Sequence, residues 1–198
     1  MIAKFNQFLG NLLHIEDLSV GKKLKVLSLF FISVISIMLL YTSFTLYQQK
    51  EDGLKINIAG RQRMLTQKFT KEFFLSQQQK QSADINYDPD MMAKSVKLFD
   101  LSLAALQHGG TTYMDLGLTK PVKLSDAGNA AVKKQLKEVS NLWQQLQSKV
   151  KCTEGIICPP ELMLEINTIS VKTLAARNKA VGMLADQSAA KVYTMQIV

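Results

Sequence analysis

The sequence predicts an all-α protein in which a transmembrane helix continues into an up-down-up-down four-helix bundle. Three observations lead to this prediction. An uncharged apolar run near the N-terminus is long enough to cross a membrane, four later stretches repeat apolar residues at helical spacing, and turn-forming residues separate these stretches. We therefore expect a cytoplasmic segment at 1–23, a transmembrane helix at 24–47 and an extracytoplasmic bundle domain at 48–198.

The transmembrane prediction rests on the run from Val26 to Tyr47, which contains no charged residue. As a helix it would span about 33 Å, enough for a hydrocarbon core of about 30 Å. Aromatic residues stand at its end, where a cleavable signal peptide would have small residues, so we expect it to be retained as an anchor. Three lysines precede the run, which places the N-terminus in the cytoplasm. Residues 1–23 fit either an amphipathic helix on the inner membrane face or a tail that only sets topology.

The first bundle helix is expected to follow the transmembrane helix without a break and to end near Ser82. Its core stripe consists of Leu54, Ile58, Leu65 and Phe69. Arg61 falls at the edge of this stripe, so its side chain is predicted to extend outwards. The opposite face is small in profile and consists of Ile56, Ala59, Gly60, Arg63, Gln67 and Thr70. Glycine inside a helix costs about 1 kcal/mol relative to alanine, so Gly60 indicates that a second helix or a small ligand approaches there.

The second helix is predicted after a turn at residues 84–90 and is expected to end at Gly109 and Gly110. Its apolar seam is Met92, Val96, Phe99, Leu103 and Leu106. Residues 109–125 lack a periodic pattern and are predicted to form a long loop.

The third helix is expected to be capped by Ser125 or Asp126. Its seam alternates spacings of four and three and consists of Val132, Leu136, Val139, Trp143, Leu146 and Val150. The last helix should run from about Glu161 towards Tyr193, with Leu162, Ile166 and Ile169 on its core side. It would then return antiparallel to the first helix.

Charge and motifs narrow the function classes. The formal charge is +8, and from Gln48 onward 20 Lys and Arg face 14 Asp and Glu, a balance of +6 that is spread over the helices. Without a basic stripe or a nucleic-acid-binding motif, we predict no nucleic-acid binding. The sequence has no nucleophile elbow, phosphate-binding glycine loop or metal-ligand spacing, so we expect no enzyme, no cofactor and no metal.

The two cysteines, Cys152 and Cys158, flank five residues before a pair of prolines. Without a histidine nearby they make a poor metal site. In an oxidising compartment we predict that they form a disulfide at the turn between the third and fourth helices.

The segment GRQRMLTQK resembles the signature of the PilJ-type domain, the N-terminal extracytoplasmic domain of type IV pili methyl-accepting chemotaxis transducers. It is also similar to the nitrate-binding box of NarX-type sensor kinases, in which an A-G-x-x-R-M core meets its copy in a second subunit. The matching residues here are Ala59, Gly60, Arg63 and Met64. Lys68 stands where the family pattern has arginine, and lysine lacks the planar fork that grips a planar anion.

The resemblance implies a ligand-sensing domain of a transmembrane chemoreceptor, held in the bacterial inner membrane with its bundle in the periplasm. It implies a homodimer that binds a small oxyanion such as nitrate through Gly60, Arg63, Met64 and Gln67. Binding would offset the repulsion between the two facing Arg63 side chains and displace the helices. A second membrane helix and a cytoplasmic signalling module are expected in a longer protein, of which this chain would be a fragment unless it is naturally short.

Other functions also fit the sequence. The same bundle serves a membrane-anchored interaction module without a small-molecule ligand, or the sensor part of a histidine kinase or cyclase. Arg63 by itself is equally typical of an ordinary solvated helix face. The identity of the ligand is not specified by the sequence.

Overall fold

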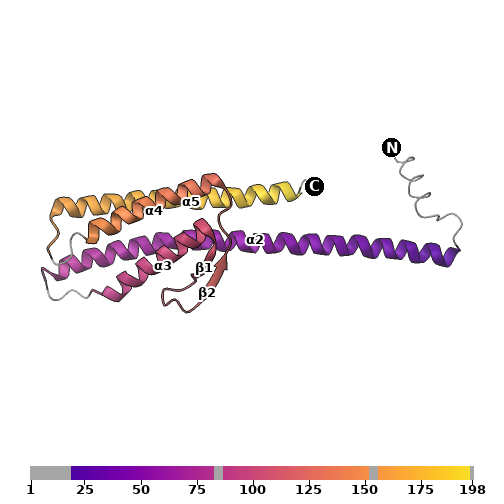
Figure 1. Cartoon of the computed structure of the whole chain (residues 1–198), viewed down its shortest axis with the longest axis horizontal. Helices are drawn as coiled ribbons and strands as arrows, with labels where there is room; N and C mark the ends of the chain where they lie inside the picture. Colours follow the sequence, from indigo (N-terminus) through magenta and orange to yellow (C-terminus); the bar gives the residue numbers. More distant parts are fainter. Residues whose placement is uncertain (1–18, 83–86, 152–155, 197–198) are drawn as a thin grey trace. The chain divides into compact units, whose positions relative to one another are not determined.

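The computed structural model describes residues 19–82, 87–151 and 156–196. Its helices are α2 (Val20–Gln79), α3 (Pro89–His108), α4 (Ala130–Lys151) and α5 (Pro160–Gln196), and its two short strands are β1 (Gly110–Tyr113) and β2 (Pro121–Leu124). The chain divides into two units, Met1–Gln48 and Gln49–Val198. In the second unit the four helices alternate in direction, which confirms the predicted all-α bundle (Figure 1).

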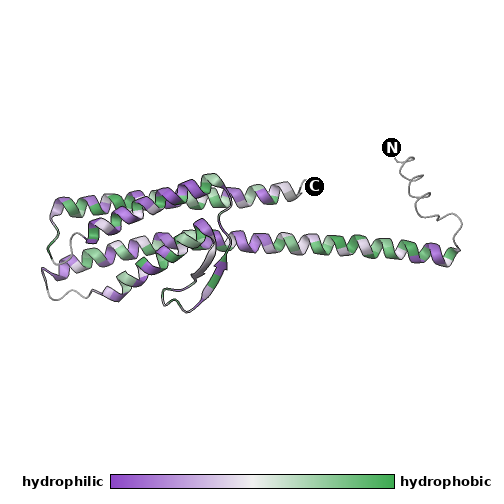
Figure 2. Cartoon of the chain, viewed as in Figure 1, coloured by the Kyte–Doolittle hydropathy of each residue, from purple (hydrophilic) through white to green (hydrophobic). Residues whose placement is uncertain are grey.

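In the first unit, the described part of α2 carries a run of exposed apolar residues, drawn in green in Figure 2. Two of its hydroxyl groups form hydrogen bonds within the helix, because Thr42 and Thr45 donate to the carbonyl oxygens of Met38 and Tyr41 at 2.8 and 2.9 Å. Of the helices that the structure describes, α2 alone has an apolar stretch long enough to span a membrane, judged by length and composition. Residues 1–18 of the predicted cytoplasmic segment lie outside the described residues.

The predicted core stripe of α2 is confirmed, since Ile58, Leu65 and Phe69 are buried and Leu54 is half-buried. The opposite face is less uniform than expected. Ala59 and Thr70 are buried. Of the three members between them, Gly60 is half-buried and Arg63 and Gln67 are exposed. The open part of the face is therefore shorter than the sequence predicted.

Helix α3 begins inside the segment that was predicted to be a turn. Pro89 occupies its first turn, and Asp88 caps it by accepting a 3.1 Å hydrogen bond from the Met91 amide. Proline needs no hydrogen-bond acceptor at that position, so it begins the helix instead of breaking it. At the other end Gly109 is the C-cap with a φ of 76°, as predicted, but Gly110 already belongs to β1.

The predicted loop at 109–125 is instead an antiparallel β-hairpin. Gly110 pairs with Leu124 and Tyr113 with Pro121. The turn is closed by Asp115, whose carboxylate accepts hydrogen bonds from the amides of Thr119 and Lys120. Strands of four residues are too short to show a clear alternation of apolar and polar residues, and their glycine and proline obscured the pattern further.

Helix α4 confirms its whole predicted seam, since all six side chains are buried. Its predicted cap was wrong: Asn129 accepts a 2.8 Å hydrogen bond from the Ala131 amide, whereas Asp126 accepts from the Gly128 amide in the preceding turn. The seam meets an aromatic cluster in which Trp143 is stacked on Phe99, with 3.8 Å between ring centroids.

Helix α5 begins and ends within a few residues of the prediction. Ile166 and Ile169 are buried and Leu162 is half-buried, which confirms its core side. The same side also buries Ser170, Thr173 and Arg177. These polar residues face α2, because Ser170 lies 2.8 Å from the Thr70 hydroxyl and Arg177 donates to Gln62. A polar seam therefore joins α2 and α5 inside the bundle.

Candidate functional site

The four predicted ligand-binding residues lie on one strip of α2, where Gly60 is half-buried and Arg63, Met64 and Gln67 are exposed. The strip occupies about two helical turns. Met64 is 43% exposed, which is unusual for a large apolar side chain in a bundle helix. The strip is thus open to a ligand or to a second chain.

Gly60 marks a place on this strip that the chain itself leaves open. A Cβ atom built there would come within 4.0 Å of one atom only, Nη2 of Arg63. The sequence predicted that a helix or ligand approaches this glycine, and no helix of the second unit does so. Among the residues that the structure describes, none therefore fills the space beside Gly60, which stays open to a ligand or a second chain.

Arg63 lies beside Gly60 and reaches across to α5. Its Nε donates to the Gly60 carbonyl oxygen at 3.3 Å, and its Nη1 donates to Oδ1 of Asn178 at 3.1 Å. No carboxylate among the described residues forms an ion pair with Arg63. Its positive charge is thus held in place by neutral acceptors and remains available to an anion.

Arg61 does not extend outwards as predicted. Its two terminal nitrogens donate to the backbone carbonyl oxygens of Tyr113 and Met114, so the side chain fastens the hairpin to α2. The desolvation that results lowers the pKa of Arg61, and the charge of Asp115 opposes this effect. Periodicity could not show this contact, because it depends on a hairpin that comes about fifty residues later.

Lys68, at the position where the family pattern has arginine, lies half-buried with its Nζ 3.6 Å from the Met91 sulfur of α3. Arg63 instead contacts Asn178 of α5. The two cations therefore extend towards different neighbouring helices, and Lys68 does not join Arg63 in one anion site.

Sequence reasoning missed the two α5 residues that meet this part of α2. Arg177 is buried beside Gln62, and the next residue, Asn178, contacts Arg63. The available signal was helical spacing, since Ser170, Thr173 and Arg177 continue the stripe of Ile166 at intervals of four, three and four.

The predicted disulfide is not tested by the structure. Cys158 is buried, its amide donates to the side chain of Gln77 at 2.9 Å, and burial raises the pKa of its thiol. Cys152 lies outside the described residues, so the pairing stays a prediction. Among the described residues, no three His, Cys, Asp or Glu side chains gather as metal ligands would.

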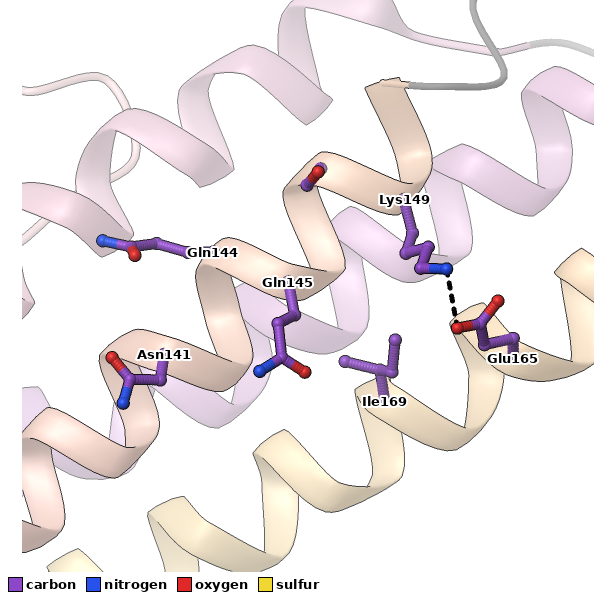
Figure 3. A pocket seen from close by; sticks show the side chains of 7 residues that line it. Asn141, Gln144, Gln145, Lys149, Glu165 and Ile169 are labelled. Atoms are coloured by element: carbon purple, nitrogen blue, oxygen red, sulfur yellow. Dashed lines mark ion pairs between the residues drawn. The ribbon is translucent and has the colours of Figure 1, made fainter.

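A hollow of about 580 Å³ lies on the surface between α4 and α5 (Figure 3). Three amide side chains, those of Asn141, Gln144 and Gln145, are among the residues that line it, and an ion pair of 2.8 Å joins Lys149 to Glu165 at one end. Because this pair neutralises its two charges and none of the predicted site residues lines the hollow, the strip on α2 remains the better candidate site.

Comparisons with known proteins agree with the fold. The family model for the PilJ domain, the N-terminal part of type IV pili methyl-accepting chemotaxis transducers, matches residues 44–156, more than half of the chain. The ligand-binding domain of the P. aeruginosa nitrate receptor McpN is similar in structure, with a TM-score of 0.53 and 19% identity over 68% of this chain and 95% of that one. A search of curated proteins found no match. The strip on α2 lies within the matched segment, whereas Arg177 and Asn178 lie beyond it.

Proposed function

The chain belongs to the PilJ family, the N-terminal domains of type IV pili methyl-accepting chemotaxis transducers, and we propose that its bundle senses a small oxyanion, with nitrate as the first candidate. The ligand would bind at Gly60, Arg63, Met64 and Gln67 of α2. Nitrate is chosen because the similar McpN domain is the ligand-binding domain of a nitrate receptor.

The observation that carries this proposal is the state of Arg63. Its guanidinium is exposed, forms no ion pair with a described residue and adjoins the open surface at Gly60. A guanidinium can donate two parallel hydrogen bonds to a planar oxyanion, which a lysine in the same place could not. This arrangement suits a small planar anion that approaches from outside the chain.

We further propose that the approach comes from a second copy of the chain in a symmetric homodimer. Beside Asn178, α5 exposes Val171 and Leu164, which are spaced by seven residues and are 56% and 67% exposed. Apolar residues that recur on one open face are typical of an interface. Around a two-fold axis, two Arg63 side chains would repel each other until an anion lies between them. The anion would then favour the arrangement in which the two charges are close.

The exposed apolar side chains of α2 support anchoring in a bacterial inner membrane, with the bundle in the periplasm. Three lysines, Lys22, Lys23 and Lys25, precede the apolar stretch and favour a cytoplasmic N-terminus. Helix α2 has no break between the two units, so a displacement at Arg63 would pass along continuous helix. We propose that a cytoplasmic signalling module receives this displacement.

The test uses the full chain in detergent micelles and calorimetric titration with nitrate, sulfate and chloride at constant ionic strength. We expect one nitrate to bind per two chains, and Arg63→Ala to weaken this binding by about tenfold or more, since a hydrogen bond to a charged group contributes roughly 1.5 to 3 kcal/mol. Lys137→Ala, which removes an exposed charge from α4, is the matched control and should leave the affinity unchanged.

An unchanged nitrate affinity in Arg63→Ala would place the site elsewhere. If the chain dimerises and binds none of the anions, the interaction module without a small-molecule ligand becomes the better description of the domain.

A further inference from the structure

Arg177 is the most buried charged residue among those that the structure describes, with 1% of its surface exposed. Its Nη1 donates to Oε1 of Gln62, and its guanidinium carbon lies 3.7 Å from the ring centroid of Phe99. Its Nε and Nη2 are buried and have no acceptor among the described residues. Buried polar atoms are nearly always satisfied in folded proteins, so these two nitrogens require a partner.

The two unsatisfied nitrogens belong to the same edge of the guanidinium. Nε–H and the nearer N–H of Nη2 point in parallel, and this edge is one of those that bind carboxylates and other planar anions in a bidentate manner. The remaining polar atom, Nη1, is the one that Gln62 already occupies. The free hydrogen-bonding capacity of Arg177 is thus arranged for one acceptor with negative charge.

The charge of Arg177 also needs a partner. No carboxylate among the described residues forms an ion pair with it, and burial alone shifts its pKa well below the ordinary value. Arginine nevertheless stays protonated in proteins, and a buried cation without an opposite charge is strongly unfavourable. Contact with the Phe99 ring and one amide oxygen compensates only part of this cost.

We propose that Nε and Nη2 of Arg177 hold a small monovalent anion, of the size of chloride or nitrate, in the interior between α2, α3 and α5. Because only 1% of the side chain is exposed, an anion must enter when the helices open transiently, and a small anion then leaves the surrounding packing least disturbed. This internal site is distinct from the strip at Arg63 and does not depend on the proposed function.

The internal anion would join three helices. Gln62 belongs to α2, and its Nε2 donates to the Phe99 carbonyl oxygen of α3 at 3.4 Å, while its Oε1 accepts from Arg177 of α5. Neutralising Arg177 stabilises both of these hydrogen bonds at once. We therefore expect the bundle to be most stable when a small anion is present.

The test measures thermal unfolding of the full chain in detergent micelles, in gluconate, chloride or nitrate at constant ionic strength. The protein carries Arg63→Ala, so that the surface strip does not contribute. We expect chloride or nitrate to raise the unfolding midpoint relative to gluconate, which is too large for the interior. The rise should be on the order of 5 °C at about 100 times the dissociation constant. Equal midpoints in the three salts would overturn the internal site.

Gln62→Glu is the decisive second variant, because it places a carboxylate beside Nη1 of Arg177 with almost no change of volume, at the loss of the hydrogen bond from Nε2 to the Phe99 carbonyl oxygen. Its midpoint should no longer respond to chloride or nitrate, because the carboxylate already neutralises the charge of Arg177. Arg177→Met should also lose the response, at a lower midpoint. An undiminished response in either variant would show that the anions act at another place.

The outcome separates the two sites. A response that Arg63→Ala removes entirely belongs to the surface strip, so the internal site fails while the proposed function stands. A response that survives Arg63→Ala and disappears in Gln62→Glu supports the internal site whether or not the surface strip senses nitrate. In crystals grown with bromide, the anomalous signal should lie at the Nε and Nη2 edge of Arg177.

Discussion

Arg63 of α2 and Asn178 of α5 meet on the surface at 3.1 Å, directly outside the buried pair formed by the residues that precede them, Gln62 and Arg177. Two consecutive residues on each helix thus make one outer and one inner contact. A shift of either helix must change both contacts together. The proposed ligand strip and the polar interior are therefore mechanically linked.

Asn178→Asp should weaken oxyanion binding by about tenfold or more, because the new carboxylate would pair with Arg63 and compete with the ligand. Calorimetric titration of the full chain with nitrate measures the change. Asn178→Ala is the control, since it removes the same contact without adding charge, and it should bind nitrate more tightly than Asn178→Asp. Equal affinities in the two variants would show that Arg63 does not contact the anion.

Arg61→Met should release the hairpin from α2. The carbonyl oxygens of Tyr113 and Met114 would lose their donors, at an expected cost of about 1 to 3 kcal/mol in the free energy of unfolding. Hydrogen exchange should speed up in residues 110–124 first. If exchange there is unchanged, the hairpin is held by its contacts with α3 alone, such as the 3.0 Å pair of Ser102 and Thr112.

Val171→Glu should dissociate the proposed homodimer without unfolding the chain, because it places a charge on an exposed part of α5 at which two copies would meet. Sedimentation in density-matched detergent measures the mass of the particle, and circular dichroism checks the helix content. Lys137→Glu on α4 is the matched surface control. A particle that stays dimeric in Val171→Glu would place the interface on another face.

Asp100 provides a prediction about pH. Desolvation raises the pKa of its carboxyl group, opposed by hydrogen bonds from Trp143 and Gln147. The residue as a whole is exposed, but the oxygen that accepts from Trp143 Nε1 at 2.7 Å lies against the aromatic cluster. Because the pKa is raised, the Asp100 carboxyl group binds its proton more tightly in the folded state than in the unfolded state. Its contribution to stability grows as pH falls through the folded-state pKa and is lost at higher pH.

Asp100→Asn should remove this dependence, because the amide oxygen still accepts from Trp143 but does not titrate. The difference in unfolding midpoint between the wild type and Asp100→Asn should shrink as the pH is lowered from 7 towards 4, with the variant the more stable at pH 7. Other carboxylates affect both proteins equally and cancel in the comparison. A difference that does not change with pH would mean that Asp100 titrates alike in both states.

The burial of apolar residues that recur at helical spacing along a single helix could be predicted well from the sequence. The α4 seam through Trp143 alternates spacings of four and three over six positions, and each of those side chains is buried. Burial of large apolar groups dominates the packing of such a helix, so periodicity alone is enough. The same holds for Ile58, Leu65 and Phe69 of α2.

Contacts between distant segments could not be predicted in this way. Arg61 was expected to lie in water, since nothing along α2 indicates that a hairpin supplies two carbonyl oxygens to it. Arg177 was overlooked because a charged residue in an alanine-rich helix normally indicates a solvated face. Only its position on the stripe of Ile166 and Thr173 shows otherwise, and that signal competes with the usual preference of arginine for the surface.

The aromatic cluster has a practical consequence. Phe99 contacts both the guanidinium of Arg177, at 3.7 Å, and the indole ring of Trp143, at 3.8 Å. Trp143 is the one tryptophan of the chain. Its fluorescence therefore reports from a position a single phenylalanine ring away from the buried cation, so that any event that moves Arg177 can be followed optically in the unlabelled protein.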